Sequence, residues 1–429
     1  MKILLASTAP YLSNFTGANK INRALVEQLA QRGHSCRVIA LRRPMFSISV
    51  VDQVLPAEKA SAGGADITTL NGVEVHSIDI ANPGQLPQLR GYLESQIRSF
   101  DPTWILISSE DWGQFLLQAA VETAADRVIY LAHTPAALPF GPDALMPNPL
   151  GTKLLQQAAG IISLSHFLSE FIRQWSGCEA LTVYPHAYGD GPFPSYGQFD
   201  HGYVTMVNPC TVKGISIFLD LARAFPSVPF AAVLSWGTTE HDRDALDALP
   251  NVTLIPPTED IESFFAQTRI LLVPSLWHEA FGLVVVEALL RGIPVIASNA
   301  GGLPEAKLNT NFVLPVNPIV HYEMDSDRSL AKEVPSQDLG PWIAALEQLL
   351  NDRALYERES ALSREAASAF LQQIGVEAYE RAFAEIATRV AAREAERTAA
   401  QAQQAELEQR LAQLSPKKRA LFEALRRKT

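Results

Sequence analysis

Short apolar runs alternate with amphipathic stretches along most of the chain. Runs such as 2–7 and 35–41 are rich in Ile, Leu and Val and predict buried strands, whereas the helical spacing of apolar residues in 20–33 predicts a helix. The opening segment thus follows the order strand, glycine-containing loop, helix, strand, which is typical of the βαβ unit of a parallel sheet. Similar runs predict further strands at 103–108, 127–132 and 160–165.

A segment rich in Pro, Gly and Tyr at 184–202 interrupts this alternation, and we interpret it as the boundary between two domains. Strands are predicted again after it, at 203–207, 229–235, 252–255, 269–274 and 294–298, with helices between them. The sequence therefore predicts an α/β protein in which two Rossmann-like, doubly wound domains, residues 1–195 and 196–375, face a cleft.

Residues from about 340 onward are predicted to be helical, which is more helix than two such domains need. We expect the helix of about 376–395 to pack back on the first domain. Residues 396–429 are then a helical tail, with a break at Ser415-Pro416 before a last basic segment.

Composition narrows the class of protein. A chain of 429 residues with 47% hydrophobic residues is typical of a globular protein of two or three domains. The net charge is −11, and neither domain has the basic excess that nucleic acid binding requires. Three widely spaced cysteines indicate free thiols rather than disulfides or a metal site. No apolar run suits a secretory signal or a membrane span, so we expect a cytoplasmic protein.

The stretch HEAFGLVVVEALLRG, residues 278–292, contains two glutamates among mostly apolar residues. An ionised carboxylate in apolar surroundings is costly without hydrogen-bond donors, so Glu287 needs a partner, which a ligand could supply. The helix is predicted to begin near Gly282, where backbone N–H groups of its first turn can bind a phosphate. Glu279 precedes this turn and Glu287 follows it. A nucleotide sugar, with phosphate between two sets of hydroxyls, fits this arrangement.

Residues 279–305, EAFGLVVVEALLRGIPVIASNAGGLPE, resemble the signature of the retaining glycosyltransferases of family 4, which have the GT-B fold. Two glutamates separated by seven residues, Phe-Gly after the first, and a later Gly-Gly-x-Pro-Glu carry the resemblance, which extends more loosely over residues 1 to about 390. It implies a hexosyltransferase that moves a sugar from a nucleotide diphosphate sugar to an acceptor hydroxyl, on a natural product or a glycan. It implies retained anomeric configuration and neither a metal nor another cofactor.

The resemblance also implies roles for individual residues. Glu279 would bind hydroxyls of the donor sugar and Glu287 those of the ribose. The backbone amides of Phe281, Gly282 and Leu283 would bind the diphosphate.

Further donor residues are implied outside this stretch. Lys213 matches a diphosphate-binding lysine, and Asn208 stands where the family usually has an arginine. Gly17 belongs to the glycine-rich first loop. His133 would lie over the donor sugar, near the reacting carbon, so that His133, Lys213 and Glu279 are the predicted catalytic residues.

On the acceptor side, we expect Glu110, Asp111 and Trp112 to face the cleft, although an ordinary polar turn explains them equally well. Two Asp-x-Asp sequences, 242–244 and 325–327, imitate a metal motif. The first opens a predicted helix, where acidic residues favour the helix dipole, and the second is in a polar loop, so we assign no metal.

Two alternatives remain open for the function. One is a different GT-B enzyme, such as a nucleotide-sugar epimerase or a sugar phosphorylase. The other is a non-catalytic nucleotide-sugar-binding protein, which Asn208 and the long tail favour.

The tail has alternatives of its own. Residues 393–429 carry nine Lys and Arg against five Asp and Glu. Residues 414–428 are similar to the short helical segment that opens many nonribosomal peptide synthetase modules. A docking element for such a partner, a coil that pairs subunits and a solvated charged helix are the three interpretations.

Overall fold

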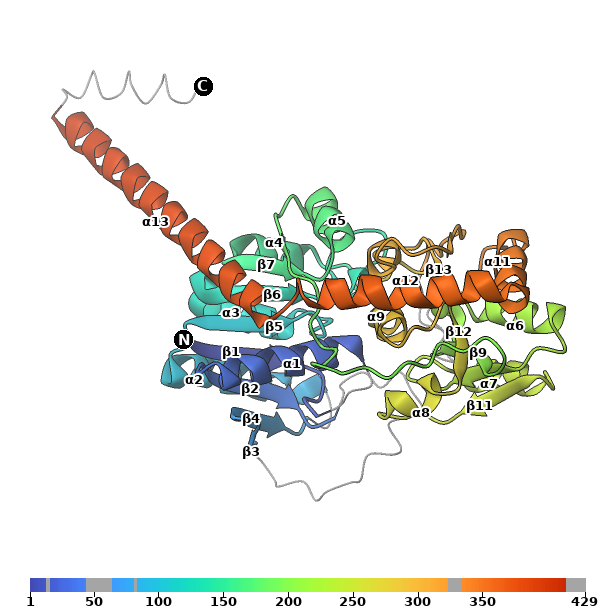
Figure 1. The fold of residues 1–429 in the computed structure, drawn as a ribbon. Coiled ribbons are helices and arrows are strands. Elements are labelled where there is room, and N and C mark those ends of the chain that lie inside the picture. Colours follow the sequence, from blue (N-terminus) through green and yellow to red (C-terminus); the bar gives the residue numbers. More distant parts are fainter. Residues whose placement is uncertain (13–15, 44–63, 81–82, 323–332, 414–429) are drawn as a thin grey trace. The chain divides into compact units, whose positions relative to one another are not determined.

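The computed structural model describes residues 1–12, 16–43, 64–80, 83–322 and 333–413. The chain divides into two compact units between Tyr379 and Glu380, which we describe separately. The first unit contains two β-sheets with helices around each of them (Figure 1). This confirms the predicted α/β architecture of two Rossmann-like domains.

The first sheet has eight strands in the order β3-β4-β2-β1-β5-β6-β7-β8, and every neighbouring pair is parallel except β3–β4. Its central strands are buried because helices cover them, which explains their continuous apolar runs. The strands are β1 (Lys2–Ser7), β2 (Ser35–Leu41), β3 (Asp66–Leu70), β4 (Val73–Ile78), β5 (Trp104–Ser108), β6 (Val128–Ala132), β7 (Gly160–Ser163) and β8 (Leu181–Thr182). The helices are α1 (Gly17–Gln31), α2 (Leu86–Phe100), α3 (Phe115–Ala124), α4 (Pro149–Gln157) and α5 (His166–Ser176).

The second sheet has six parallel strands in the order β11-β10-β9-β12-β13-β14. They are β9 (Tyr203–Val207), β10 (Phe230–Val233), β11 (Val252–Ile255), β12 (Thr268–Val273), β13 (Val295–Ser298) and β14 (Val313–Leu314). The helices are α6 (Ile215–Ala224), α7 (Glu240–Asp247), α8 (Ile261–Phe265), α9 (Leu283–Leu290), α10 (Leu303–Ala306), α11 (Gly340–Asn351) and α12 (Arg353–Leu371). The Asp-x-Asp sequence 242–244 lies in α7, where Asp242 forms a capping box with Thr239. The second such sequence, 325–327, lies outside the described residues.

Helix α1 begins one turn earlier than the sequence predicts. The Thr16 hydroxyl accepts a hydrogen bond from the backbone N–H of Asn19 at 3.2 Å and caps the helix at Gly17. The glycine-containing loop is therefore shorter, and Gly17 and Lys20 lie on one helical face, three residues apart.

The segment predicted as a domain boundary, 184–202, is held against the second domain. The backbone N–H of Tyr196 donates to the Arg291 carbonyl at 2.8 Å, and Arg364 of α12 donates to the Pro194 carbonyl at 3.1 Å. A Cβ atom at Gly197 would lie 2.1 Å from the Gly292 carbonyl oxygen, so only glycine permits this approach. The segment thus connects the two sheets through fixed contacts.

The two domains of the first unit also meet through the partly buried carboxylate of Glu305. Glu305 of α10 accepts hydrogen bonds from the backbone N–H groups of His166 and Phe167, at 2.9 and 2.7 Å, and from the Tyr184 hydroxyl at 2.9 Å. His166 and Phe167 are the first residues of α5, so a side chain of one domain caps a helix of the other. Beside it, Ser165 donates to the Ala280 carbonyl at 2.5 Å.

Helix α13 (Val376–Ala412) extends from the first unit into the second and continues through position 395 without a break. Its later part is stabilised along the helix surface by ion pairs one turn apart, such as Arg389–Glu385 and Arg410–Glu406. The predicted packing of 376–395 on the first domain stays a prediction, and Ser415-Pro416 lies outside the described residues. Among the described residues, no helix is both long and apolar enough to cross a bilayer.

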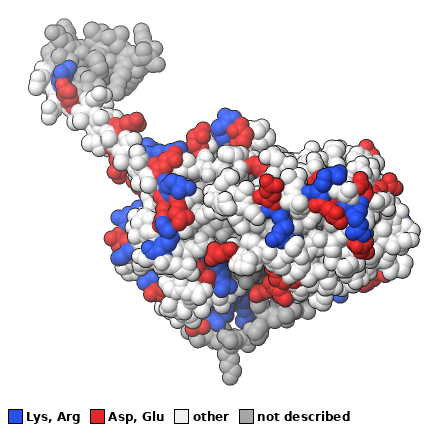
Figure 2. Space-filling model, viewed as in Figure 1, with Lys and Arg blue, Asp and Glu red and all other residues white. Residues whose placement is uncertain are grey.

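Figure 2 shows Lys and Arg side chains next to Asp and Glu over the visible face of the molecule. Among the residues coloured there, they do not merge into one continuous basic area. This mixed distribution gives nucleic acid no evident electrostatic surface on that face.

We expect Glu305→Ala to lower the free energy of unfolding by about 1–3 kcal/mol, because three hydrogen bonds across the domain contact lose their acceptor. Urea unfolding followed by tryptophan fluorescence measures this. Glu365→Ala is the matched control, since Glu365 is exposed on α12. Equal midpoints for the two variants would show that Glu305 does not stabilise the domain contact.

Candidate active site

A cavity of about 440 Å³ lies between the carboxyl ends of the strands of both sheets. Ligands of open α/β sheets bind at such edges, because the loops that follow parallel strands converge there. Of the site residues predicted from the sequence, all but Asp111 line this cavity: Gly17, Glu110, Trp112, His133, Asn208, Lys213, Glu279, Phe281, Gly282, Leu283 and Glu287.

Glu279 lies in the loop between β12 and α9 and is held by two donors. The Lys213 ammonium contacts Glu279 Oε1 at 2.5 Å, and the Ser275 hydroxyl donates to the same oxygen at 2.6 Å. Burial alone would raise the pKa of Glu279, but the charge and hydrogen bond of Lys213 outweigh it and leave the pKa lowered. Lys213 Nζ also lies 4.7 Å from the centre of the Trp277 ring. Contacts within the protein thus hold the side chains of Lys213 and Glu279 together.

The first turn of α9 has no side-chain cap. Gly282 precedes it with φ of 111°, and a Cβ atom there would lie 2.7 Å from Leu303 Cδ2. Both facts favour glycine at this position. Because the first N–H groups of a helix have no partner within it, this turn has the donors that a phosphate requires.

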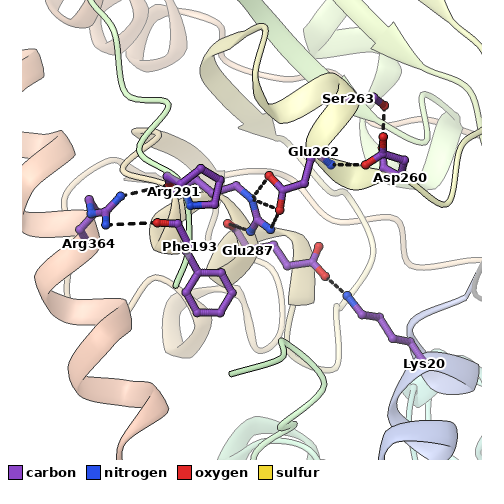
Figure 3. Close-up of polar contacts among 9 residues, drawn as sticks. Lys20, Phe193, Asp260, Glu262, Ser263, Glu287, Arg291 and Arg364 are labelled. Atoms are coloured by element: carbon purple, nitrogen blue, oxygen red, sulfur yellow. Dashed lines mark hydrogen bonds and ion pairs between the residues drawn. The ribbon is translucent and has the colours of Figure 1, made fainter. Parts of the chain in front are cut away.

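Glu287 is 7% exposed and, contrary to the expectation that its donors arrive with a ligand, has a partner within the protein. The Lys20 ammonium, on α1 of the first domain, donates to Glu287 Oε1 (Figure 3). Arg291, one turn further along the helix, instead pairs with Glu262 and donates to the Glu287 carbonyl at 2.7 Å. The sequence reasoning missed Lys20. The signal was its position three residues after Gly17, on the face that turns to the cleft.

Asn208, where the resemblance leads one to expect arginine, adopts a left-handed backbone conformation with φ of 59°. Its Oδ1 accepts a hydrogen bond from the Gly237 N–H at 2.9 Å. Its Nδ2 is buried without a hydrogen-bond partner in the described protein. A buried donor that lines a cavity without a partner is suited to an anionic or carbonyl oxygen of a ligand.

His133 follows β6 and is 7% exposed. Its Nδ1 lies 3.3 Å from the Ser109 hydroxyl, which also accepts the His133 backbone N–H at 3.0 Å. Burial lowers the pKa of His133 to about 4. The imidazole is therefore neutral at physiological pH and can orient a ligand by hydrogen bonding without carrying charge.

Glu110 and Trp112 line the first-domain side of the cavity, and their role in binding an acceptor stays a prediction. Burial raises the pKa of Glu110 to about 7. Trp112 packs against apolar side chains of the second domain. The two side chains therefore place one titratable group and one aromatic surface beside the site.

Asp111 is placed differently from the prediction. It is 1% exposed and accepts hydrogen bonds from the backbone N–H groups of Phe115, Leu116 and Leu117, at 3.0, 2.7 and 3.0 Å. These N–H groups belong to the first turn of α3 and have no acceptor within the helix. The Asp111 carboxylate therefore caps the start of α3 instead of facing an acceptor substrate. A strand-end loop that precedes a helix needs such a cap, and Asp111 provides it.

Comparisons with known proteins show which family of proteins this chain is similar to. A family model described as Glycosyltransferase Family 4 matches residues 15–188, and one described as Glycosyl transferases group 1 matches residues 237–320. A D-inositol 3-phosphate glycosyltransferase of Corynebacterium diphtheriae is 30% identical over 131 residues, which are 30% of this chain and 26% of that protein. The match thus spans about a quarter of that relative's length.

Solved structures match over nearly the whole chain. Sucrose-phosphate synthase from Thermosynechococcus elongatus has a TM-score of 0.64 at 16% identity, covering 93% of this chain and 100% of its own. Anabaena HepE in complex with UDP-glucose has a TM-score of 0.62 at 16% identity, covering 92% and 100%. The two facing domains and these neighbours define the fold as GT-B, the fold of many glycosyltransferases.

The particular family follows from the sequence. The two glycosyltransferase family models match residues 15–188 and 237–320, which together are more than half of the chain, and the protein therefore belongs to the glycosyltransferases of the family 4 type.

We expect Asp111→Ala to lower the free energy of unfolding by about 1–3 kcal/mol, because three N–H groups at the start of α3 lose a buried acceptor. Urea denaturation tests this, with exposed Asp126→Ala just beyond α3 as the control. Full stability in Asp111→Ala would restore the interpretation of Asp111 as a ligand-facing residue.

The raised pKa of Glu110 predicts a pH-dependent stability. Between the ordinary value of 4.5 and about 7, the folded protein keeps a proton that the unfolded chain has lost, so the stability contribution of Glu110 falls as pH rises through this window. Glu110→Gln removes the effect. We compare the free energy of unfolding of Glu110→Gln with that of the natural protein at pH 5 and at pH 8. The difference in favour of the variant should be about 1–3 kcal/mol larger at pH 8 than at pH 5, after allowance for partial exposure. An equal difference at both pH values would contradict the raised pKa.

Proposed function

We propose that the protein is a retaining glycosyltransferase that moves a hexosyl group from a nucleotide diphosphate sugar to an acceptor hydroxyl without a metal ion. The observation that carries the proposal is the arrangement of Glu279, Lys213 and Glu287 around the uncapped first turn of α9, inside the cavity between the domains. This arrangement matches the chemistry of a donor with phosphates between two groups of hydroxyls.

For the donor, we assign hydroxyls of the sugar to Glu279 and hydroxyls of the ribose to Glu287. The diphosphate would bind Lys213, the amides of residues 281–283 and the free Nδ2 of Asn208. That the related fold of HepE was solved with UDP-glucose supports a nucleotide sugar as the class of donor and makes UDP the first nucleotide to test.

For the acceptor, we assign the first-domain wall with Glu110 and Trp112. An aromatic ring and a carboxyl group that is partly protonated near neutral pH suit a hydroxyl-rich acceptor on a glycan or a natural product, since such a carboxyl group both accepts hydrogen bonds from hydroxyls and donates one.

In the proposed reaction the acceptor oxygen attacks the anomeric carbon on the face from which the diphosphate leaves. A phosphate oxygen takes the acceptor proton as the carbon–oxygen bond to the diphosphate breaks. Lys213 and the α9 amides stabilise the charge that develops on the leaving group. The neutral His133 orients the sugar, and the contact between the domains holds donor and acceptor together.

Metal independence rests on the character of the site. Among the described residues there is no group of three or more His, Cys, Asp and Glu side chains that could hold a metal ion. Lys213 and the α9 amides are the groups that we assign to the role of charge neutralisation.

Glu279→Ala and Glu287→Ala should each reduce sugar transfer by about 10- to 100-fold while the protein stays folded, because each removes hydroxyl contacts worth roughly 1–3 kcal/mol. Transfer and nucleotide release are measured with purified protein and a panel of nucleotide sugars, with Glu365→Ala as control. Release of nucleotide without acceptor turnover would indicate hydrolysis, and sugar interconversion would indicate an epimerase. Transfer rates close to that of the natural protein in both variants would contradict the assignment of Glu279 and Glu287 to the donor hydroxyls.

Activity should persist in excess chelator, since the proposed leaving-group partners are cationic side chains and amides. Loss of turnover with EDTA, restored by a divalent cation, would contradict metal independence and reopen the Asp-x-Asp sequences as candidates.

We further propose that the tail pairs subunits or docks on a partner, and that it is dispensable for donor chemistry. Removing residues 400–429 should leave donor hydrolysis unchanged and lower either the number of subunits per oligomer or the affinity for a partner. Light scattering measures the number of subunits, and a binding assay measures the affinity for a partner. A truncated protein with unchanged subunit number, partner affinity and acceptor turnover would favour the solvated charged helix.

A further inference from the structure

The cavity contains two basic side chains among its described lining residues, and each is bound to one of the two donor-site glutamates. Lys213 of the second domain contacts Glu279, and Lys20 of the first domain contacts Glu287. A diphosphate brings at least two negative charges into this partly buried space. Without a rearrangement of these pairs, the ligand would meet carboxylates whose counter-ions are already occupied.

Helix α1 of the first domain contacts α9 of the second domain at two places. A Cβ atom at Gly17 would lie 3.2 Å from Leu283 Cδ1, at the start of α9. One turn further along each helix, Lys20 meets Glu287. Leu283, at the start of α9, and Glu287 are four residues apart, which is about 6 Å along the helix axis. A lysine side chain is long enough to cover such a separation.

The position of Glu287 makes this contact exchangeable. Glu287 is 7% exposed, whereas the Lys20 side chain is 29% exposed and so has room to move. Lys20 occupies Oε1 of Glu287, so a ribose whose hydroxyls bind both oxygens of this carboxylate would compete with Lys20. When Lys20 is displaced from Glu287, its ammonium group needs another anionic partner. The diphosphate of the same ligand would provide it.

The second domain offers little positive charge to a diphosphate. Asn208 contributes a free amide donor but no charge, and Lys213 also has to neutralise Glu279. A second cation from the first domain would balance the ligand, and it would tie donor binding to both domains.

We propose that Lys20 is a second diphosphate-binding residue, held by Glu287 until the ribose of the donor takes its place. This rests on the proposed function, because it assumes a nucleoside diphosphate in the cavity. Glu287 then exchanges a lysine for hydroxyls, and Lys20 exchanges a carboxylate for a phosphate.

The test compares ligands with and without phosphate on the full-length protein. Calorimetry with UDP, GDP and ADP first identifies the nucleotide that binds, and its nucleoside is the phosphate-free partner. We expect Lys20→Met to weaken the nucleoside diphosphate at least tenfold and the nucleoside less than threefold, with Lys20→Arg close to the natural protein. Lys153→Met, an exposed lysine of α4, is the control. Adding Asn208→Arg to Lys20→Met should restore part of the affinity.

Inorganic pyrophosphate provides a second, independent probe. It has no ribose to release Lys20, so the natural protein must break the Lys20–Glu287 pair unaided. We expect Glu287→Gln to bind pyrophosphate several-fold more tightly than the natural protein, whereas Glu287→Gln/Lys20→Met should lose that gain.

The outcomes separate this proposal from the proposed function. If the natural protein binds no nucleoside diphosphate, the donor assignment falls and takes the role of Lys20 with it. If it binds one, and Lys20→Met leaves the affinity unchanged or weakens nucleoside and nucleoside diphosphate equally, only the role of Lys20 falls. Lys20 would then merely hold Glu287 and the two domains together.

Discussion

The pairing of buried charge is the constraint on which the site depends. Three acidic side chains, those of Glu110, Glu279 and Glu287, line one cavity between the two domains, and an unpaired carboxylate there is costly. The protein meets this cost in two ways. Lysines from opposite domains pair with Glu279 and Glu287, and burial raises the pKa of Glu110 to about 7, so that it is partly protonated near neutral pH. Under the proposed function, the same groups would meet a ligand that is anionic at its centre and rich in hydroxyls at both ends.

The fold supplies the geometry that this pairing needs. Parallel strands in both sheets bring their carboxyl ends to the cavity, and the first turn of α9 presents free N–H groups there. Contacts between the two domains hold these parts next to one another. The main contact is Glu305, which caps α5 of the other domain. In the proposed complex, a donor that binds Lys213 of one domain and Lys20 of the other would add a further contact between the two domains.

Much of this could be predicted from the sequence, because local signals determine it. Apolar runs such as 2–7 and 203–207 coincide with β1 and β9, since buried parallel strands leave a continuous apolar pattern. The hairpin of β3 and β4 was not predicted, because β3 is mostly exposed and lacks that pattern. Its Asn71-Gly72 turn, with φ of 47° and 82°, was the available signal. Asp111 was misplaced and Lys20 was missed for one reason: each is defined by a partner that sequence spacing does not show, the start of α3 and the distant Glu287.

We propose that a nucleoside diphosphate enters the cavity and exchanges partners with the charged side chains that line it. A crystal structure of the protein with a bound nucleoside diphosphate tests this most directly. It should show the ribose hydroxyls on Glu287 and the diphosphate at the first turn of α9, with both Lys213 and Lys20 on its oxygens. A nucleotide bound elsewhere, or a diphosphate in the cavity with the Lys20–Glu287 pair still intact, would contradict it.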